Sequence, residues 1–129
     1  MFSGNFTYQV GYGPYMESRS GEWTFLDVPE LAACRDTAQA VRRNAGAESA
    51  QMYTRDEEGR RVHWYFKIDM IKGGGIGSSS ETPREAKARL ERELADPEVG
   101  HIELTKHTEG CDFITRVGWR RGKDGEWEK

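Results

Sequence analysis

The chain has 129 residues, of which 36% are hydrophobic and 32% are charged, and its formal net charge at pH 7 is −3. A chain of this length can bury a core without metal or disulfide support, and 11% aromatic residues exclude a disordered chain. The slightly acidic balance excludes the overall basic character of DNA-packaging proteins. No apolar run approaches the roughly 20 residues that span a bilayer. The N-terminus does not have the pattern of a signal peptide, so we expect a cytoplasmic protein with reduced thiols and no membrane partner.

The first third of the chain predicts two strands and a helix. Apolar and polar residues alternate over residues 6–12, which is the period of a half-buried strand. A second strand is predicted over residues 22–26. Asp27 then stands in the N-cap position and Glu30 in the capping-box position, and apolar residues follow at helical spacing. We expect this helix to end at Gly46, where a positive φ is needed.

A hairpin and a second helix follow. The strands that contain Met52 and Trp64 can pair through a three-residue loop, 57–59, whose glycine accepts a positive φ. A helix is predicted over residues 83–95, with a proline in its first turn. We expect this helix to end at Asp96, because Pro97 disfavours helical backbone at the residue before it.

A last hairpin joins a strand over residues 99–107 to a strand over residues 111–121. Residues 109–110 (Glu-Gly) suit a two-residue turn. In that register Glu103 lies opposite Arg116, and such an opposite-charge pair supports the pairing.

The predicted order is therefore ββαββαββ. It indicates an α+β fold in which two helices cover one face of a single, largely antiparallel sheet of about six strands. The central six elements, residues 23–107, follow the order of a ferredoxin-like split βαβ unit, and two ββα units followed by a hairpin are the alternative. We expect residues 1–121 to form a single domain and residues 122–129 to form a loose C-terminal tail.

A glycine-rich segment lies between the fourth predicted strand and the second predicted helix. Its backbone N–H groups, placed before a helix N-terminus, could gather around an anion. The spacing of its glycines fits neither the Walker A motif nor the dinucleotide motif, and a flexible connector is the alternative. The residues expected to contact an anion or nucleotide are Lys72, Gly73, Gly75, Gly77, Ser78 and Arg84.

The sheet face away from the helices is the second candidate site. Aromatic and charged residues of this kind are typical of a protein-binding surface or a homodimer interface. Rings among cations also resemble surfaces on which nucleic acid bases stack. A plain solvated face is the alternative. The residues expected on this face are Tyr53, His63, Tyr65, Lys67 and Arg116.

No metal, cofactor or catalytic residue is predicted. Cys34 falls on the apolar stripe of the first helix and Cys111 lies at a hairpin mouth, so neither is expected to be a nucleophile. A solvated polar face accounts for the outward-pointing metal-ligand candidates without an ion. These candidates are His63, His101, Glu103 and His107.

These observations favour a small non-catalytic binding or regulatory protein that recognises a partner protein, or a second copy of itself, through the exposed sheet face. A short chain without catalytic residues would also suit a phage or mobile-element accessory protein. The alternative is a nucleic-acid or nucleotide-binding protein that uses the glycine-rich loop and the basic strand over residues 116–123. A third hypothesis is an enzyme whose general base is His63 or His101.

Overall fold

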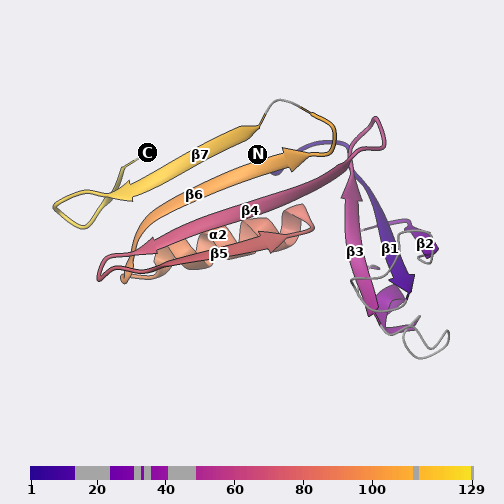
Figure 1. Cartoon of the computed structure of the whole chain (residues 1–129), viewed down its shortest axis with the longest axis horizontal. Coiled ribbons are helices and arrows are strands. Elements are labelled where there is room, and N and C mark those ends of the chain that lie inside the picture. The colour runs from indigo at the N-terminus through magenta and orange to yellow at the C-terminus, as the bar shows by residue number, and fades with distance from the viewer. Residues whose placement is uncertain (14–23, 31–32, 34–35, 41–48, 112–113, 129) are drawn as a thin grey trace. The chain divides into compact units, whose positions relative to one another are not determined.

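Figure 1 shows the computed structural model of the chain, which describes residues 1–13, 24–30, 33, 36–40, 49–111 and 114–128. These residues form eight strands, the helix α2 and a helical segment at residues 36–40. The chain divides into an N-terminal unit, Gly4–Arg61, and a C-terminal unit, Val62–Lys129 with Met1–Ser3. Among the described residues, no helix is both long and apolar enough to cross a membrane.

The described part of the N-terminal unit contains three antiparallel strands. β1 (Thr7–Gly13) lies in the centre and pairs with β2 (Thr24–Val28) and β3 (Ser49–Arg55). The alternation over residues 6–12 therefore predicts β1 and its inward side correctly. The core of this unit contains Val10, Val28 and Ala50, and residues packed against it include Tyr8, Tyr12, Ala38 and Met52.

The first helix does not begin where the sequence predicts. Asp27, expected as its N-cap, lies in β2 opposite Gln9, and its carboxylate accepts a hydrogen bond from Gln9 Nε2 at 2.8 Å. Because β2 continues to Val28, Asp27 cannot cap a helix. Residues 36–40 are helical. Much of the predicted helix, including Cys34, lies outside the described residues.

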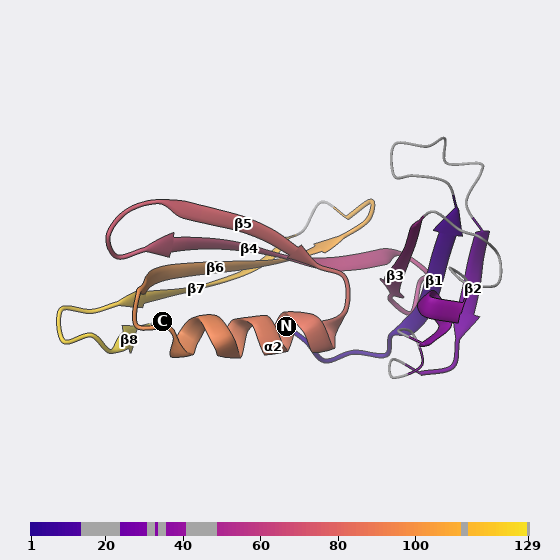
Figure 2. The same ribbon diagram turned by 90° about the horizontal axis from the view of Figure 1, so that it is seen from below.

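The C-terminal unit is an antiparallel sheet with a helix on one face. Its strands lie in the order β5-β4-β6-β7-β8. Helix α2 (Pro83–Ala95) contacts β5 and β6, and Figure 2 shows it on one side of the sheet. The strand bounds are Arg61–Met70 (β4), Gly75–Ser80 (β5), Val99–Thr108 (β6), Thr115–Arg121 (β7) and Trp127–Glu128 (β8).

The side chains of β4 alternate between the two faces of this sheet. On the α2 side, Val62, Trp64, Phe66 and Ile68 are at most 1% exposed. The prediction that Trp64, Phe66 and Leu104 face inward together is confirmed, and Val117, which pairs with Leu104, is half-buried. The buried apolar residues of this core are Val62, Trp64, Phe66, Ile68, Ala86, Leu90, Val99, Ile102 and Leu104.

The glycine-rich segment forms a strand rather than a loop. Met70 N–H donates to Gly74 O at 3.0 Å, across a turn in which Gly73 and Gly74 have φ values of 97° and 90°. The chain then returns along β4 as β5, with Ser78 opposite Phe66. Glycine and serine show no apolar alternation, so pairing with β4, and not local propensity, determines this strand.

The element order and the sheet predicted from the sequence are therefore wrong. The order is βββββαβββ, with the helical segment at residues 36–40 between β2 and β3, instead of ββαββαββ. Eight strands replace the predicted six, because β5 and β8 were not expected. The two helical segments belong to different units, so the prediction of two helices on one face of a ferredoxin-like sheet is also wrong.

The last hairpin has the predicted turn but a different register. Cys111 N–H donates to Thr108 O at 3.1 Å across the two-residue turn. Farther along the ladder, Glu103 pairs with Gly118 instead of Arg116. Each residue of β6 thus lies opposite a residue two positions later than predicted. A shift of two residues keeps every side chain on its predicted face, because the side-chain period of a strand is two.

Residues 122–128, expected to form a loose tail, contain β8. Trp127 of β8 pairs with Arg121 of β7, and the Arg121 guanidinium lies 4.1 Å from the centre of the Trp127 ring. Trp127 Nε1 donates to Leu94 O at 2.8 Å, and Arg121 donates to Asp96 O at 2.9 Å. These contacts connect the C-terminal strands to the end of α2.

Candidate binding face

One face of the C-terminal sheet, opposite α2, carries four of the five residues predicted for the exposed sheet face. We call it the open face. Antiparallel pairing arranges its side chains in rows across the strands, because paired residues share a face. Its members are His63, Tyr65, Lys67 and Asp69 of β4, His101, Glu103, Thr105 and His107 of β6, and Arg116, Gly118 and Arg120 of β7.

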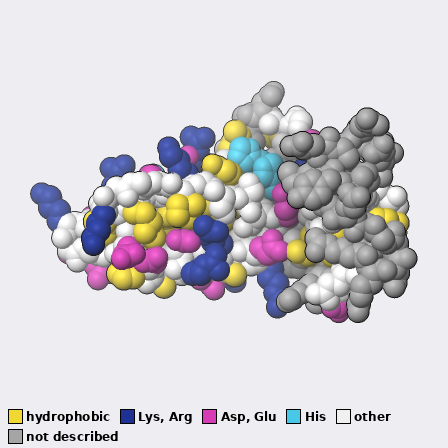
Figure 3. All heavy atoms as spheres, turned by 60° about the horizontal axis from the view of Figure 1, so that its bottom comes forward, with side chains coloured by type: hydrophobic (Ala, Val, Ile, Leu, Met, Phe, Trp, Pro, Cys, Tyr) yellow, Lys and Arg dark blue, Asp and Glu magenta, His cyan; other side chains and the backbone are white. Residues whose placement is uncertain are grey.

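Three rings gather at one end of the open face. His63 lies opposite His107, and their imidazole rings stack with centroids 5.0 Å apart and planes 7° apart. The Tyr65 ring approaches His107 edge-on, with a centroid distance of 6.5 Å. Figure 3 shows histidine side chains together in one surface patch. His63, Tyr65 and His107 therefore form one continuous surface, which we call the ring cluster.

Charged residues of both signs lie on the same face as the ring cluster. Arg116 Nε is 3.4 Å from Glu103 Oε1, although Glu103 sits opposite Gly118, so the ion pair is diagonal. The expected contact between these two charges thus forms in a different register. His101 Nδ1 lies 3.1 Å from Asp69 Oδ2. The Arg116 side chain is 60% exposed, so this ion pair adds little stability and its cation remains accessible to a partner.

Two glycines of β5 make room for side chains of β4. A Cβ at position 77 would collide with the Tyr65 hydroxyl, and a Cβ at position 75 would lie 2.9 Å from Asp69 Oδ1. Gly77 and Gly75 therefore allow the Tyr65 and Asp69 side chains to lie over β5. An aromatic ring that covers a glycine of a neighbouring strand also shields the backbone there.

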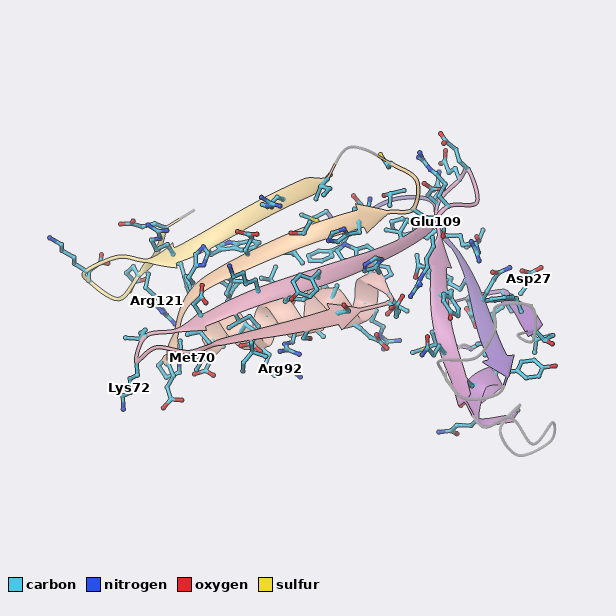
Figure 4. All side chains as sticks on the ribbon, in the orientation of Figure 1. Asp27, Met70, Lys72, Arg92, Glu109 and Arg121 are labelled. Atoms are coloured by element: carbon cyan, nitrogen blue, oxygen red, sulfur yellow. The ribbon has the colours of Figure 1, made fainter. Side chains whose placement is uncertain are left out.

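The residues predicted to form an anion site lie at separate places. The strand β5, at roughly 3.3 Å per residue, separates the β4–β5 turn from the start of α2 by about 17 Å. Lys72 and Arg84 are therefore not brought together, and Figure 4 places Lys72 at the tip of the hairpin. Lys72 and Gly73 are in the exposed turn, Gly75, Gly77 and Ser78 are in β5, and Arg84 is exposed in the first turn of α2.

Tyr53, also predicted for the sheet face, lies in β3 of the N-terminal unit. Its ring packs edge-on against Phe25, with centroids 5.5 Å apart, and the Arg61 guanidinium lies over it at 4.7 Å. The Tyr53 hydroxyl donates to Gln51 Oε1 at 3.2 Å. Tyr53 thus has its contacts within its own unit and is not part of the ring cluster.

The candidate metal ligands are arranged in pairs. His63 stacks on His107, His101 lies beside Asp69, and Glu103 lies beside Arg116. Within the described ranges, no group of three or more His, Cys, Asp or Glu residues is arranged to hold a metal ion. The Cys111 thiol is free and half-buried.

Sequence reasoning did not assign His107 to the binding face or Arg121 to the end of α2. The outward direction of His107 on its strand was the available signal, but its contact with His63 depends on the pairing of β4 with β6. For Arg121, no local signal indicates that its guanidinium reaches the carbonyl groups at the end of a helix.

Comparison of the chain with models of protein families, with curated protein sequences and with solved structures finds no match. The open face is therefore interpreted from its own residues and contacts.

Proposed function

We propose that this protein is a small non-catalytic binding or regulatory protein that recognises a partner protein through the open face. The observation that supports the proposal is the ring cluster beside the exposed Arg116. Tyrosine and arginine are enriched at the centres of protein interfaces, because each combines a large contact area with polar groups. Tyr65 is 39% exposed, so much of its ring is available for contact.

The mixture of charges on the open face favours a protein partner. Lys67, Arg116 and Arg120 lie among two carboxylates, Asp69 and Glu103. A surface with charges of both signs complements another protein surface, whereas a nucleic acid backbone presents negative charge only.

Alanine substitution of Tyr65 and Arg116 tests the proposal. Affinity capture from an extract of the source cells identifies the partner, and direct titration then compares its affinity for the wild type and the Tyr65→Ala/Arg116→Ala variant. We expect the variant to lose at least about tenfold in affinity, because two central interface residues are removed. Its circular dichroism should match the wild type.

Arg92→Ala is the matched control for the charge. Arg92 is exposed on α2, on the other side of the sheet, and is labelled in Figure 4. This variant should bind like the wild type. Equal affinity of the partner for the wild type and for the Tyr65→Ala/Arg116→Ala variant would contradict the proposal.

Single-stranded nucleic acid is a second candidate partner. It is favoured by Lys67, Arg116 and Arg120, which lie on the same face as rings on which bases could stack. Arg121 and Lys72 lie elsewhere, at the end of α2 and at the hairpin tip. Titration with an oligothymidylate at low and high salt tests this candidate. Affinity that falls steeply with salt would support it, and no binding at low salt would reject it.

A further inference from the structure

β5 is an edge strand whose own side chains lack the features that usually protect an edge from pairing. Among the described strands it pairs only with β4. Its sequence, Gly-Ile-Gly-Ser-Ser-Ser, contains no charged residue and no proline. The unpaired N–H and C=O groups of such an edge can recruit another strand. Its exposed residues are Gly75, Ile76, Gly77 and Ser79.

The opposite edge of the same sheet is protected. β7 carries Arg116, Arg120 and Arg121, and the two-residue strand β8 covers its end. Charged side chains and very short strands are devices by which proteins prevent edge-to-edge pairing. Their presence at β7 and their absence from β5 indicate that β5 is the edge that pairs with another strand.

We infer that the protein forms a two-fold dimer in which β5 of one copy pairs antiparallel with β5 of a second copy. This contact covers both unprotected edges at once, and a two-fold interface is closed, so no further copy adds to it. The small side chains of β5 meet without collision, and Ile76, which is 53% exposed, becomes covered by the second strand. The two open faces then lie on the same side of one continuous sheet, because paired residues share a face.

The charges at the two ends of β5 fit antiparallel pairing of identical strands. Lys72 precedes β5, whereas Glu81, Arg84 and Glu85 follow it. Antiparallel pairing places the start of one β5 beside the end of the other, so each Lys72 lies near two carboxylates and one guanidinium of the second copy. Burial and the nearby charge of Glu81 raise the pKa of Glu85. A cation from the second copy would stabilise the ionised form of Glu85.

Sedimentation velocity and native mass spectrometry of the full chain test this inference. The wild type is expected at twice the chain mass of 14.7 kDa. Ile76→Lys brings two ammonium groups close together near the two-fold axis, so this variant should be a monomer. Ile114→Lys is the matched control, because Ile114 is 49% exposed and lies beside the protected edge, and it should remain a dimer. A monomeric wild type or a dimeric Ile76→Lys variant would overturn the inference.

Three more variants separate pairing of β5 from misfolding and from partner binding. Ser79→Lys should also be a monomer with the circular dichroism of the wild type, and a folded, dimeric Ser79→Lys variant would overturn the inference. Lys72→Glu should raise the dimer Kd about two- to fivefold, the range expected for one exposed ion pair. An unchanged Kd would count against the antiparallel order. The inference does not depend on the proposed function, because Arg116→Ala should remain a dimer even where it loses the partner.

Discussion

Substitutions on the two faces of β4 should have different effects on the stability of the fold. On one face Trp64 and Phe66 are fully buried, and Trp64 Nε1 also donates to Met1 O at 3.2 Å. On the other face Tyr65 and Lys67 are exposed, although they are the chain neighbours of those core residues. One buried face is enough to hold an antiparallel strand in place, so the other face is free to carry recognition residues. The open face can therefore change its side chains without unfolding the unit.

Phe66→Ala and Tyr65→Ala test this comparison at adjacent positions. Phe66→Ala removes a fully buried ring, so we expect the free energy of unfolding to fall by about 3–5 kcal/mol. Tyr65→Ala should lower it by about 1 kcal/mol, because the Tyr65 ring is partly exposed and contacts only Gly77 and the edge of the His107 ring on the open face. Urea titration measures both changes. Similar losses for the two variants would show that the open face is part of the core.

Arg121→Ala and Arg120→Ala extend the comparison to β7. The Arg121 side chain donates hydrogen bonds to three backbone carbonyl oxygens, at 2.8, 2.9 and 3.1 Å, whereas Arg120 is exposed on the open face. We expect Arg121→Ala to lower the free energy of unfolding by about 2–3 kcal/mol. Arg120→Ala should lower it by less than about 0.5 kcal/mol. Thermal unfolding of both variants measures the difference.

Arg121→Lys is the control for the shape of the guanidinium. An ammonium group cannot reach the three carbonyl groups as the planar guanidinium does, so this variant should recover only part of the lost stability. Full recovery by lysine, or an Arg120→Ala variant as unstable as Arg121→Ala, would contradict the role assigned to Arg121.

The elements that local patterns determine could be predicted from the sequence. Helix α2 spans the expected residues, because Thr82 Oγ1 accepts a hydrogen bond from Glu85 N–H at 3.2 Å and caps the first turn. The loop at residues 57–59 also forms as expected, with Gly59 at a φ of 79°. In both cases the residues that decide the structure are close together in the chain.

The elements that depend on a distant partner could not be predicted. The composition of β5 is typical of a flexible linker, and it becomes a strand only because β4 pairs with it. Asp27 is a good cap residue, but Gln9 of β1 donates a hydrogen bond to its carboxylate within a strand pair. Long-range pairing therefore overrides local propensity at both positions.

The candidate site could likewise be predicted only in part from the sequence. Alternation along the strands is sufficient to point His63, Tyr65 and Arg116 outward. It cannot select the neighbours of these residues, because a register shift of two residues leaves every side chain on its face. The contact between His63 and His107 and the diagonal position of Arg116 beside Glu103 therefore required the structure.

Two carboxyl groups have pKa values that shift in opposite directions. In the turn after β3, desolvation raises the pKa of Asp56, but hydrogen bonds from Arg60 and Glu58 and the charge of Arg60 outweigh it, so the pKa lies below its usual value. At the start of α2, burial raises the pKa of Glu85. A hydrogen bond from Glu81 N–H lowers the pKa of Glu85, and the Glu81 charge raises it, so the net shift is upward.

Stability should therefore depend on pH with opposite signs for these two groups. Folded Asp56 binds its proton less readily, so its stabilisation is present above the ordinary pKa of 3.8 and is lost as the pH falls through its lowered pKa. Folded Glu85 holds its proton more strongly, so stability is greatest below 4.5 and falls as the pH rises from 4.5 through its raised pKa. Urea titrations between about pH 3 and about pH 6 measure both effects. Asp56→Asn should reduce the loss of stability at low pH, and Glu85→Gln should reduce the loss of stability as the pH rises from 4.5. A Glu85→Gln curve parallel to the wild type would contradict the raised pKa of Glu85, because an amide has no proton to lose.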